Sequence, residues 1–111
     1  MQLNKEIKKD SYAVKITATD DGKEIGRARL YILYNDLHTE PFGLVEDVFV
    51  EEKYRGSGIG TKLVQGLIEE SKKIGCYKLI ATVRNSKEEA CAWYEKFGFK
   101  NYGVEFRMDL R

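Results

Sequence analysis

The stretch VEEKYRGSGIGTKLV (residues 50–64) places Gly56, Gly58 and Gly60 at alternate positions between an apolar run and an amphipathic one. Glycine loses more conformational entropy on folding than other residues and offers no side chain for packing, so another property must favour it here. Glycines that lead into a helix N-terminus leave backbone N–H groups open to an anion, and the helix dipole adds to the attraction. The stretch therefore predicts either a phosphate cradle or a turn that needs glycine for its geometry alone.

The residues before this stretch predict three strands. SYAVKITAT (residues 11–19) and EIGRARLYILY (24–34) both alternate apolar and polar side chains, and Asp21-Gly22 between them is typical of a tight turn. LVEDVFVEE (44–52) is a third extended run, rich in valine. We therefore expect an antiparallel hairpin followed by a strand that leads into the glycines.

The residues after the glycines change period. Apolar side chains recur at helical spacing over residues 59–74, and Gly75 is a natural stop for that helix. YKLIATV (77–83) reads as a short buried strand. The sequence thus predicts a helix and then a return to the sheet.

A second helix and a closing segment follow. Ser86 and Glu89 have the spacing of a capping box, and Gly98 ends the helical pattern. The tail GFKNYGVEFRMDL (98–110) alternates as one or two closing strands. The predicted order is β-β-β-α-β-α-β(β), an α+β fold with a mixed, mainly antiparallel sheet.

Length and charge limit the classes of function. The chain has 111 residues, which suits one domain over residues 1–111, and its 19 basic and 18 acidic residues give a net charge of +1. That balance favours neither a nucleic-acid nor a membrane partner. The opening MQLNKEIKKD has no apolar core, so a cytoplasmic location is expected. Cys76, Cys91 and His38 lack the spacing of a metal site, and no metal is expected.

Two common phosphate-binding motifs fail. A Walker loop has a glycine five residues after its first one, and here Thr61 stands five after Gly56 with no glycine-lysine pair following. The dinucleotide motif G-x-G-x-x-G fails in both registers, because Thr61 and Leu63 occupy its last position. A nucleotide-binding protein is therefore the weakest of the interpretations.

The segment does match R-x-x-G-x-G through Arg55, Gly58 and Gly60. Here the sequence resembles the GNAT superfamily of acetyl-CoA-dependent N-acyltransferases. DVFVEEKYRGSGIGTKLVQGLIEES (residues 47–71) is similar to the strand–loop–helix core of that family, and AWYEKFGF (92–99) to its second signature. The resemblance covers roughly residues 44–100 and implies a GNAT-like acyl-CoA N-acyltransferase fold with acetyl-CoA as cosubstrate.

The resemblance also implies which residues bind the cofactor. Backbone N–H groups at the glycines would bind the coenzyme A pyrophosphate, and a strand distortion before them would pair with the pantetheine arm and polarise the acetyl carbonyl. The pyrophosphate residues are Arg55, Gly56, Ser57, Gly58, Ile59, Gly60 and Thr61; the pantetheine residues are Val48, Phe49 and Val50; and Asn85 is a further cofactor contact.

Two catalytic roles are expected. Tyr94 resembles the tyrosine that protonates the departing thiolate, although its place beside Trp93 also suits a core tyrosine. Glu46 is the first choice as the base that deprotonates the amine, with Asp47 and Glu51 as alternatives. Strand alternation predicts that Glu46 faces opposite to Asp47 and Glu51. A solvated carboxylate with no catalytic role is the competing interpretation of each.

One departure from the family concerns the acceptor. Members of the family carry one or two helices between their first two strands, whereas here Asp20-Asp21-Gly22 joins the strands directly. This is compatible with a shallow site for a peptide or protein amine, with a homodimer in which a second subunit completes the site, or with a module that binds acyl-CoA without transferring it. The favoured function is an N-acetyltransferase in which a primary amine attacks acetyl-CoA directly; the runner-up is the non-catalytic module.

Overall fold

The computed structural model describes residues 1–111. Its elements, in chain order, are β1 (Tyr12–Asp20), β2 (Lys23–Leu33), β3 (Phe42–Val50), the short 3-10 helix η1 (Glu52–Tyr54), α1 (Ile59–Ile74), β4 (Leu79–Ala81) and α2 (Glu88–Lys96). The predicted order β-β-β-α-β-α is confirmed. Residues 1–80 and 81–111 form two compact units. The single domain over 1–111 stays a prediction.

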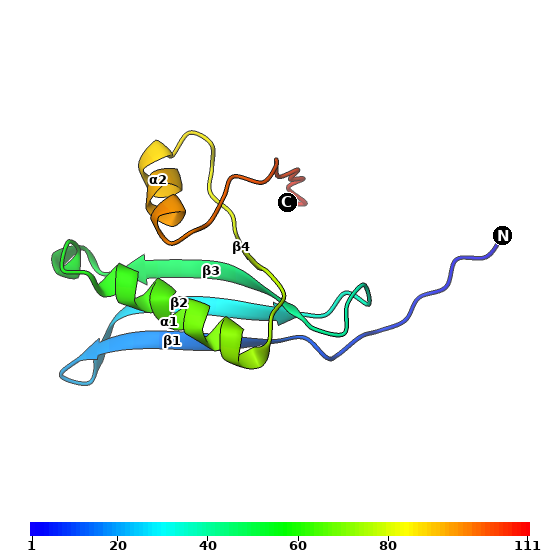
Figure 1. Cartoon of the computed structure of the whole chain (residues 1–111), viewed down its shortest axis with the longest axis horizontal. Coiled ribbons are helices and arrows are strands. Elements are labelled where there is room, and N and C mark those ends of the chain that lie inside the picture. Colours follow the sequence, from blue (N-terminus) through cyan, green and yellow to red (C-terminus); the bar gives the residue numbers. More distant parts are fainter. The chain divides into compact units, whose positions relative to one another are not determined.

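The four strands form one sheet in the order β1-β2-β3-β4 (Figure 1). β1 and β2 pair antiparallel, and the turn residues Asp21 and Gly22 both have positive φ, 51° and 75°. Two positive φ values in a two-residue loop are the mark of a type I′ hairpin turn. The predicted hairpin is confirmed, and β3 extends it as a third antiparallel strand.

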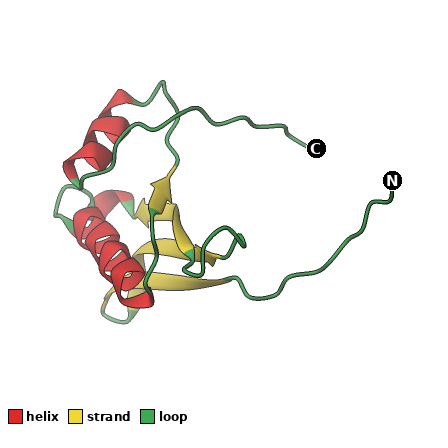
Figure 2. Ribbon diagram, turned by 45° about the vertical axis from the view of Figure 1, so that its right-hand side comes forward, coloured by secondary structure: helices red, strands yellow, loops and turns green.

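The helix α1 lies along one face of this sheet (Figure 2). Its observed bounds are those that the apolar spacing predicts, and Gly75 ends it with φ 93°. The core between helix and sheet consists of Ile25, Ala28, Leu30, Ile32, Val45, Leu63, Val64 and Leu67. Gly26 allows the close approach of the helix, because a Cβ atom there would lie 3.3 Å from both Ile59 Cγ2 and Leu63 Cδ1.

A β-bulge interrupts β3 shortly before the glycines. Arg27 pairs with Phe49 and Arg29 with Glu46, so Asp47 and Val48 together oppose one residue of β2. Asp47 has a φ of 54°, a conformation that aspartate tolerates better than most residues. An extra residue reverses the alternation, so Val45 before the bulge and Val48 after it both face α1.

The helix of the second unit ends just before Gly98, as predicted, but its start differs from the prediction. α2 has Lys87 as its N-cap and no side-chain cap, so the predicted Ser86–Glu89 capping box is wrong. The helix starts one residue later than that box requires, which puts Glu89 at the second helical position, where its charge still favours the helix dipole.

The predicted closing strands do not form. Residues 99–111 have no regular secondary structure, and residues 100–111 are exposed. Alternation makes a segment suitable for a strand, but a strand also needs a partner with free backbone groups, which the sequence pattern does not supply. No helix of the structure has the length and apolar character that a membrane crossing requires.

Candidate active site

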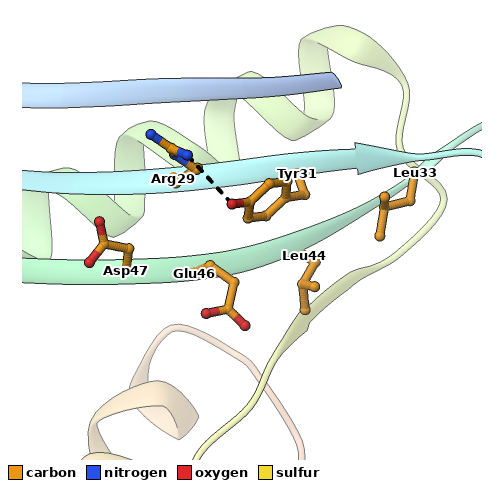
Figure 3. Close-up of a pocket in the computed structure, with 6 residues that line it drawn as sticks. All are labelled: Arg29, Tyr31, Leu33, Leu44, Glu46 and Asp47. Carbon is orange, nitrogen blue, oxygen red and sulfur yellow. Dashed lines mark hydrogen bonds between the residues drawn. The ribbon is translucent and has the colours of Figure 1, made fainter. Parts of the chain in front are cut away.

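The face of the sheet turned away from α1 carries a shallow pocket of about 520 Å³. Arg29, Tyr31 and Leu33 of β2 line it together with Leu44, Glu46 and Asp47 of β3 (Figure 3). On β2 these residues alternate with the buried Ala28, Leu30 and Ile32, so the core pattern itself assigns them to the opposite face. The charged side chains gather at one end of the pocket and the two leucines at the other.

Glu46 and Asp47 both line this pocket. The prediction that they face opposite sides of the sheet is therefore wrong. Strict alternation would have separated them, but the bulge inserts Asp47 as an extra residue and brings both carboxylates to the same face.

The two carboxylates differ in their partners. Asp47 accepts hydrogen bonds from Arg27 Nε at 2.7 Å and from Arg27 Nη2 at 3.2 Å, a bidentate pair. That hydrogen bonding, with the positive charges of Arg27, Arg29 and Lys15, lowers the pKa of Asp47 below its usual value. Glu46 forms no ion pair and no side-chain hydrogen bond. Of the two, only Glu46 is available to accept a proton from a ligand.

The glycine segment forms the turn at the start of α1. Gly56 and Gly58 have φ values of 84° and 87°, and a Cβ atom at either position would meet nothing within 4 Å. Gly58 is the N-cap of α1; no side chain caps the helix and its first turn holds no acidic residue. Ser57 does not serve as a cap, because its hydroxyl donates to the Tyr54 carbonyl at 2.6 Å.

The backbone donors of this turn are consequently unused. The N–H groups of residues 56–61 donate to no other group of the protein, and the first internal bond of the helix runs from Lys62 N to Gly58 O at 3.1 Å. Such N–H groups at a helix start, with the positive end of the dipole behind them, suit a phosphate. Gly60 lies within the first turn of α1 itself.

Arg55 and Phe49 connect the turn to the bulged strand. Arg55 Nε donates to the Val50 carbonyl at 2.8 Å. The guanidinium groups of Arg55 and Arg27 lie 5.5 Å and 4.7 Å from the centre of the Phe49 ring. Both cations are thereby held near the end of β3, while the Arg55 Nη atoms stay open to a ligand.

The backbone of residues 48–50 has a free edge on one side. The bonds from Gly43 N to Lys78 O and from Tyr77 N to Pro41 O come just before the three-residue β4, and because the two segments run in the same direction, β4 lies beside the residues that follow Gly43. Beyond that point β3 pairs with β2 alone, and an extended ligand can hydrogen-bond to such an edge.

The remaining predicted residues lie in the second unit. Tyr94, half-buried on α2, packs edge-on against Trp93 at 5.0 Å and Phe99 at 5.5 Å between ring centres. Asn85 is exposed in the loop before the helix. Cys91 of this unit and Cys76 of the first are free thiols. The structure gathers no three His, Cys, Asp or Glu side chains that could hold a metal ion.

Sequence reasoning missed Arg29 and Tyr31 as pocket residues, and it missed the Arg27–Asp47 pair. A signal was present in the valines alone, which move from an odd number (Val45) to even numbers (Val48, Val50) along β3. Such a change of parity indicates a bulge, and the polar positions of β2 then identify the exposed face.

These features can be compared with known proteins. The sequence pattern of the Acetyltransferase (GNAT) family matches residues 2–99. The chain belongs to the GNAT family. It is 43% identical over 68 residues to a glucosamine 6-phosphate N-acetyltransferase of Trypanosoma brucei brucei, a match that covers 61% of this chain and 44% of the relative.

Two further similarities of this GNAT chain cover more of its length. It is 31% identical over 95 residues to N-alpha-acetyltransferase 30 of Schizosaccharomyces pombe, covering 84% of this chain and 61% of that one. The crystal structure of glucosamine-6-phosphate N-acetyltransferase from Arabidopsis thaliana superposes with a TM-score of 0.79 at 26% identity, over 89% of this chain and 67% of the other. The chain spans 38–44% of the length of the first three curated relatives that it matches.

Proposed function

We propose that this protein is an N-acetyltransferase that transfers the acetyl group of acetyl-CoA to a primary amine. The observation that carries the proposal is the bulge of β3. It lies next to an unpaired carboxylate, Glu46, which lines a pocket on the same strand that leads into the uncapped, glycine-lined start of α1. Family membership supports acetyl-CoA as the cosubstrate.

The proposed cofactor site uses the backbone. The N–H groups from Arg55 to Thr61 bind the pyrophosphate, and the free edge of Val48, Phe49 and Val50 pairs with the pantetheine arm, with one N–H donating to the acetyl oxygen. Asn85 is a further cofactor contact. The proposed reaction uses no metal ion.

The proposed reaction is one direct displacement. The amine loses a proton to Glu46, its nitrogen forms a bond to the acetyl carbon, and the bond from that carbon to sulfur breaks. Tyr94 gives its hydroxyl proton to the departing thiolate, so the products are an N-acetyl amide and free coenzyme A.

The acceptor is a primary amine of a peptide, a protein or a small molecule. Glucosamine 6-phosphate is the first compound to assay, because several of the curated relatives are named for it. The alternative function is a module that binds acyl-CoA without transferring it. A homodimer that completes the site is compatible with the shallow pocket on the sheet.

The test is release of free coenzyme A thiol from acetyl-CoA in the presence of an amine panel. We expect steady release with at least one amine, together with a product heavier by one acetyl group in mass spectrometry. Acetyl-CoA binding by calorimetry without turnover on a broad panel of amines and peptides would establish the non-catalytic module instead.

Replacing Gly58 with valine should weaken acetyl-CoA binding about tenfold or more. A branched side chain at a φ of 87° strains the turn and covers the N–H groups that are proposed to bind the pyrophosphate. Calorimetric titration of the folded variant with acetyl-CoA measures the effect.

Gly75→Val is the matched control. Gly75 also has a positive φ, 93°, with open space around it, but it lies at the opposite end of α1. Both variants should lose about 1–2 kcal/mol of folding free energy through the same strain. Equal acetyl-CoA affinity in the two variants would remove the cradle assignment.

A further inference from the structure

Arg29 has donors that the protein does not use. Its Nε atom is buried and has no hydrogen-bond partner. Its one hydrogen bond runs from Nη1 to the Tyr31 hydroxyl at 3.5 Å, which is long for such a bond (Figure 3). A buried donor without a partner is costly, and such a group in a native protein calls for an explanation, for example a catalytic role or a bound ion.

The residue opposite Arg29 on β3, Glu46, does not pair with it either. Arg29 and Glu46 are direct partners in the β2–β3 register, yet the two side chains form no ion pair within 4.0 Å. Arg27 and Asp47, on the same two strands, do pair at 2.7 Å. Apart from Asp47, which is paired with Arg27, the pocket therefore holds one cation and one anion, Arg29 and Glu46, and these two form no ion pair with each other.

These two charges suit a ligand that carries both signs. Directly opposed residues of an antiparallel pair have their β-carbons about 4.5–5.5 Å apart, so both side chains can reach one small molecule. Leu33, Leu44 and the Tyr31 ring line the rest of the pocket and can receive its carbon skeleton.

We infer that the acceptor is a small amine that also carries an anionic group, a carboxylate or a phosphate, and that Arg29 binds this group. The Arg29 guanidinium holds the anion by charge-assisted hydrogen bonds while the amine faces Glu46. Neutral amines and polycationic amines are then poorer acceptors. That the ligand is an amine acceptor rests on the proposed function, whereas the binding of its anionic group rests on Arg29 alone.

The test compares amines that differ only in the anion. Glucosamine 6-phosphate is set against glucosamine, and L-methionine against L-methioninamide, with binding measured by calorimetry and turnover by thiol release. We expect at least one anionic member to bind about tenfold or more tightly than its neutral partner and to show the larger kcat/KM. A difference within the glucosamine pair would identify phosphate as the preferred anion, and a difference within the methionine pair would identify carboxylate. Equal affinities within both pairs would overturn the inference.

Variants test whether the preference for anionic amines depends on Arg29. Arg29→Gln should abolish the preference by weakening the anionic amine alone, and Arg29→Lys should restore part of it because the charge remains. Lys15→Gln is the matched control, since Lys15 is the β1 partner of Arg29 and its loss removes one nearby positive charge. A preference that survives in Arg29→Gln, or that falls equally in Lys15→Gln, would contradict the role of Arg29.

The two hypotheses fail separately. If anionic amines bind in an Arg29-dependent manner but no thiol is released, the proposed transferase activity fails and the anion site stands. If thiol is released equally with neutral and anionic amines, the transferase stands and the anion site fails.

Discussion

Glu46→Gln should lower kcat about 100-fold at neutral pH, the range that a positioned general base contributes. Glutamine keeps the shape of the side chain but cannot accept the proton of the attacking amine. The loss should shrink as the pH rises towards the pKa of the acceptor, about 10.4 for an alkylammonium group, because the amine then arrives already deprotonated. A pH–rate profile of the wild type and the variant measures both effects.

Asp47→Asn is the control for this experiment. Asparagine tolerates the φ of 54° at the bulge, so the backbone is retained, and the Arg27 pair already keeps the Asp47 carboxylate from acting as a base. We expect a clearly smaller loss that does not depend on pH in the same way. A larger loss in Asp47→Asn than in Glu46→Gln would assign the base to Asp47 and refute the choice of Glu46.

The parts of the fold that could be predicted are those set by local pattern. The bounds of α1 follow from its apolar spacing and from Gly75, and the hairpin turn follows from Asp21-Gly22. The capping box and the closing strands failed for different physical reasons. The box requires an exact helix start, which shifts by a residue at little cost, and the strands require a partner that lies outside their own sequence.

The site was predictable only where it depends on local sequence. The glycine turn depends on positive φ values, and glycine is the residue that adopts them most readily, so its presence in the sequence indicates the turn. The pocket instead depends on which residues two strands place on one face, and the bulge at Asp47 brought that residue to the face of Glu46. Arg29 could not be singled out from sequence, because its significance lies in a hydrogen bond and an ion pair that it does not form.

Tyr94→Phe should lower kcat about 100-fold or more while leaving the affinity for acetyl-CoA within about threefold. Phenylalanine keeps the ring that packs against Trp93 and Phe99, so only the hydroxyl is removed. If that hydroxyl protonates the thiolate, its loss raises the barrier for breaking the carbon–sulfur bond and leaves cofactor binding intact. Single-turnover kinetics and calorimetry on the same preparation separate the two quantities.

Tyr102→Phe is the matched control for the loss of a hydroxyl, because Tyr102 lies in the same unit and is 99% exposed. It should keep the activity of the wild type. Full activity in Tyr94→Phe would assign Tyr94 to packing alone, the interpretation that its aromatic neighbours also allow. Loss of acetyl-CoA affinity in proportion to kcat would instead make Tyr94 a binding residue, since a group that acts only on the leaving thiolate stabilises the transition state and not the bound cofactor.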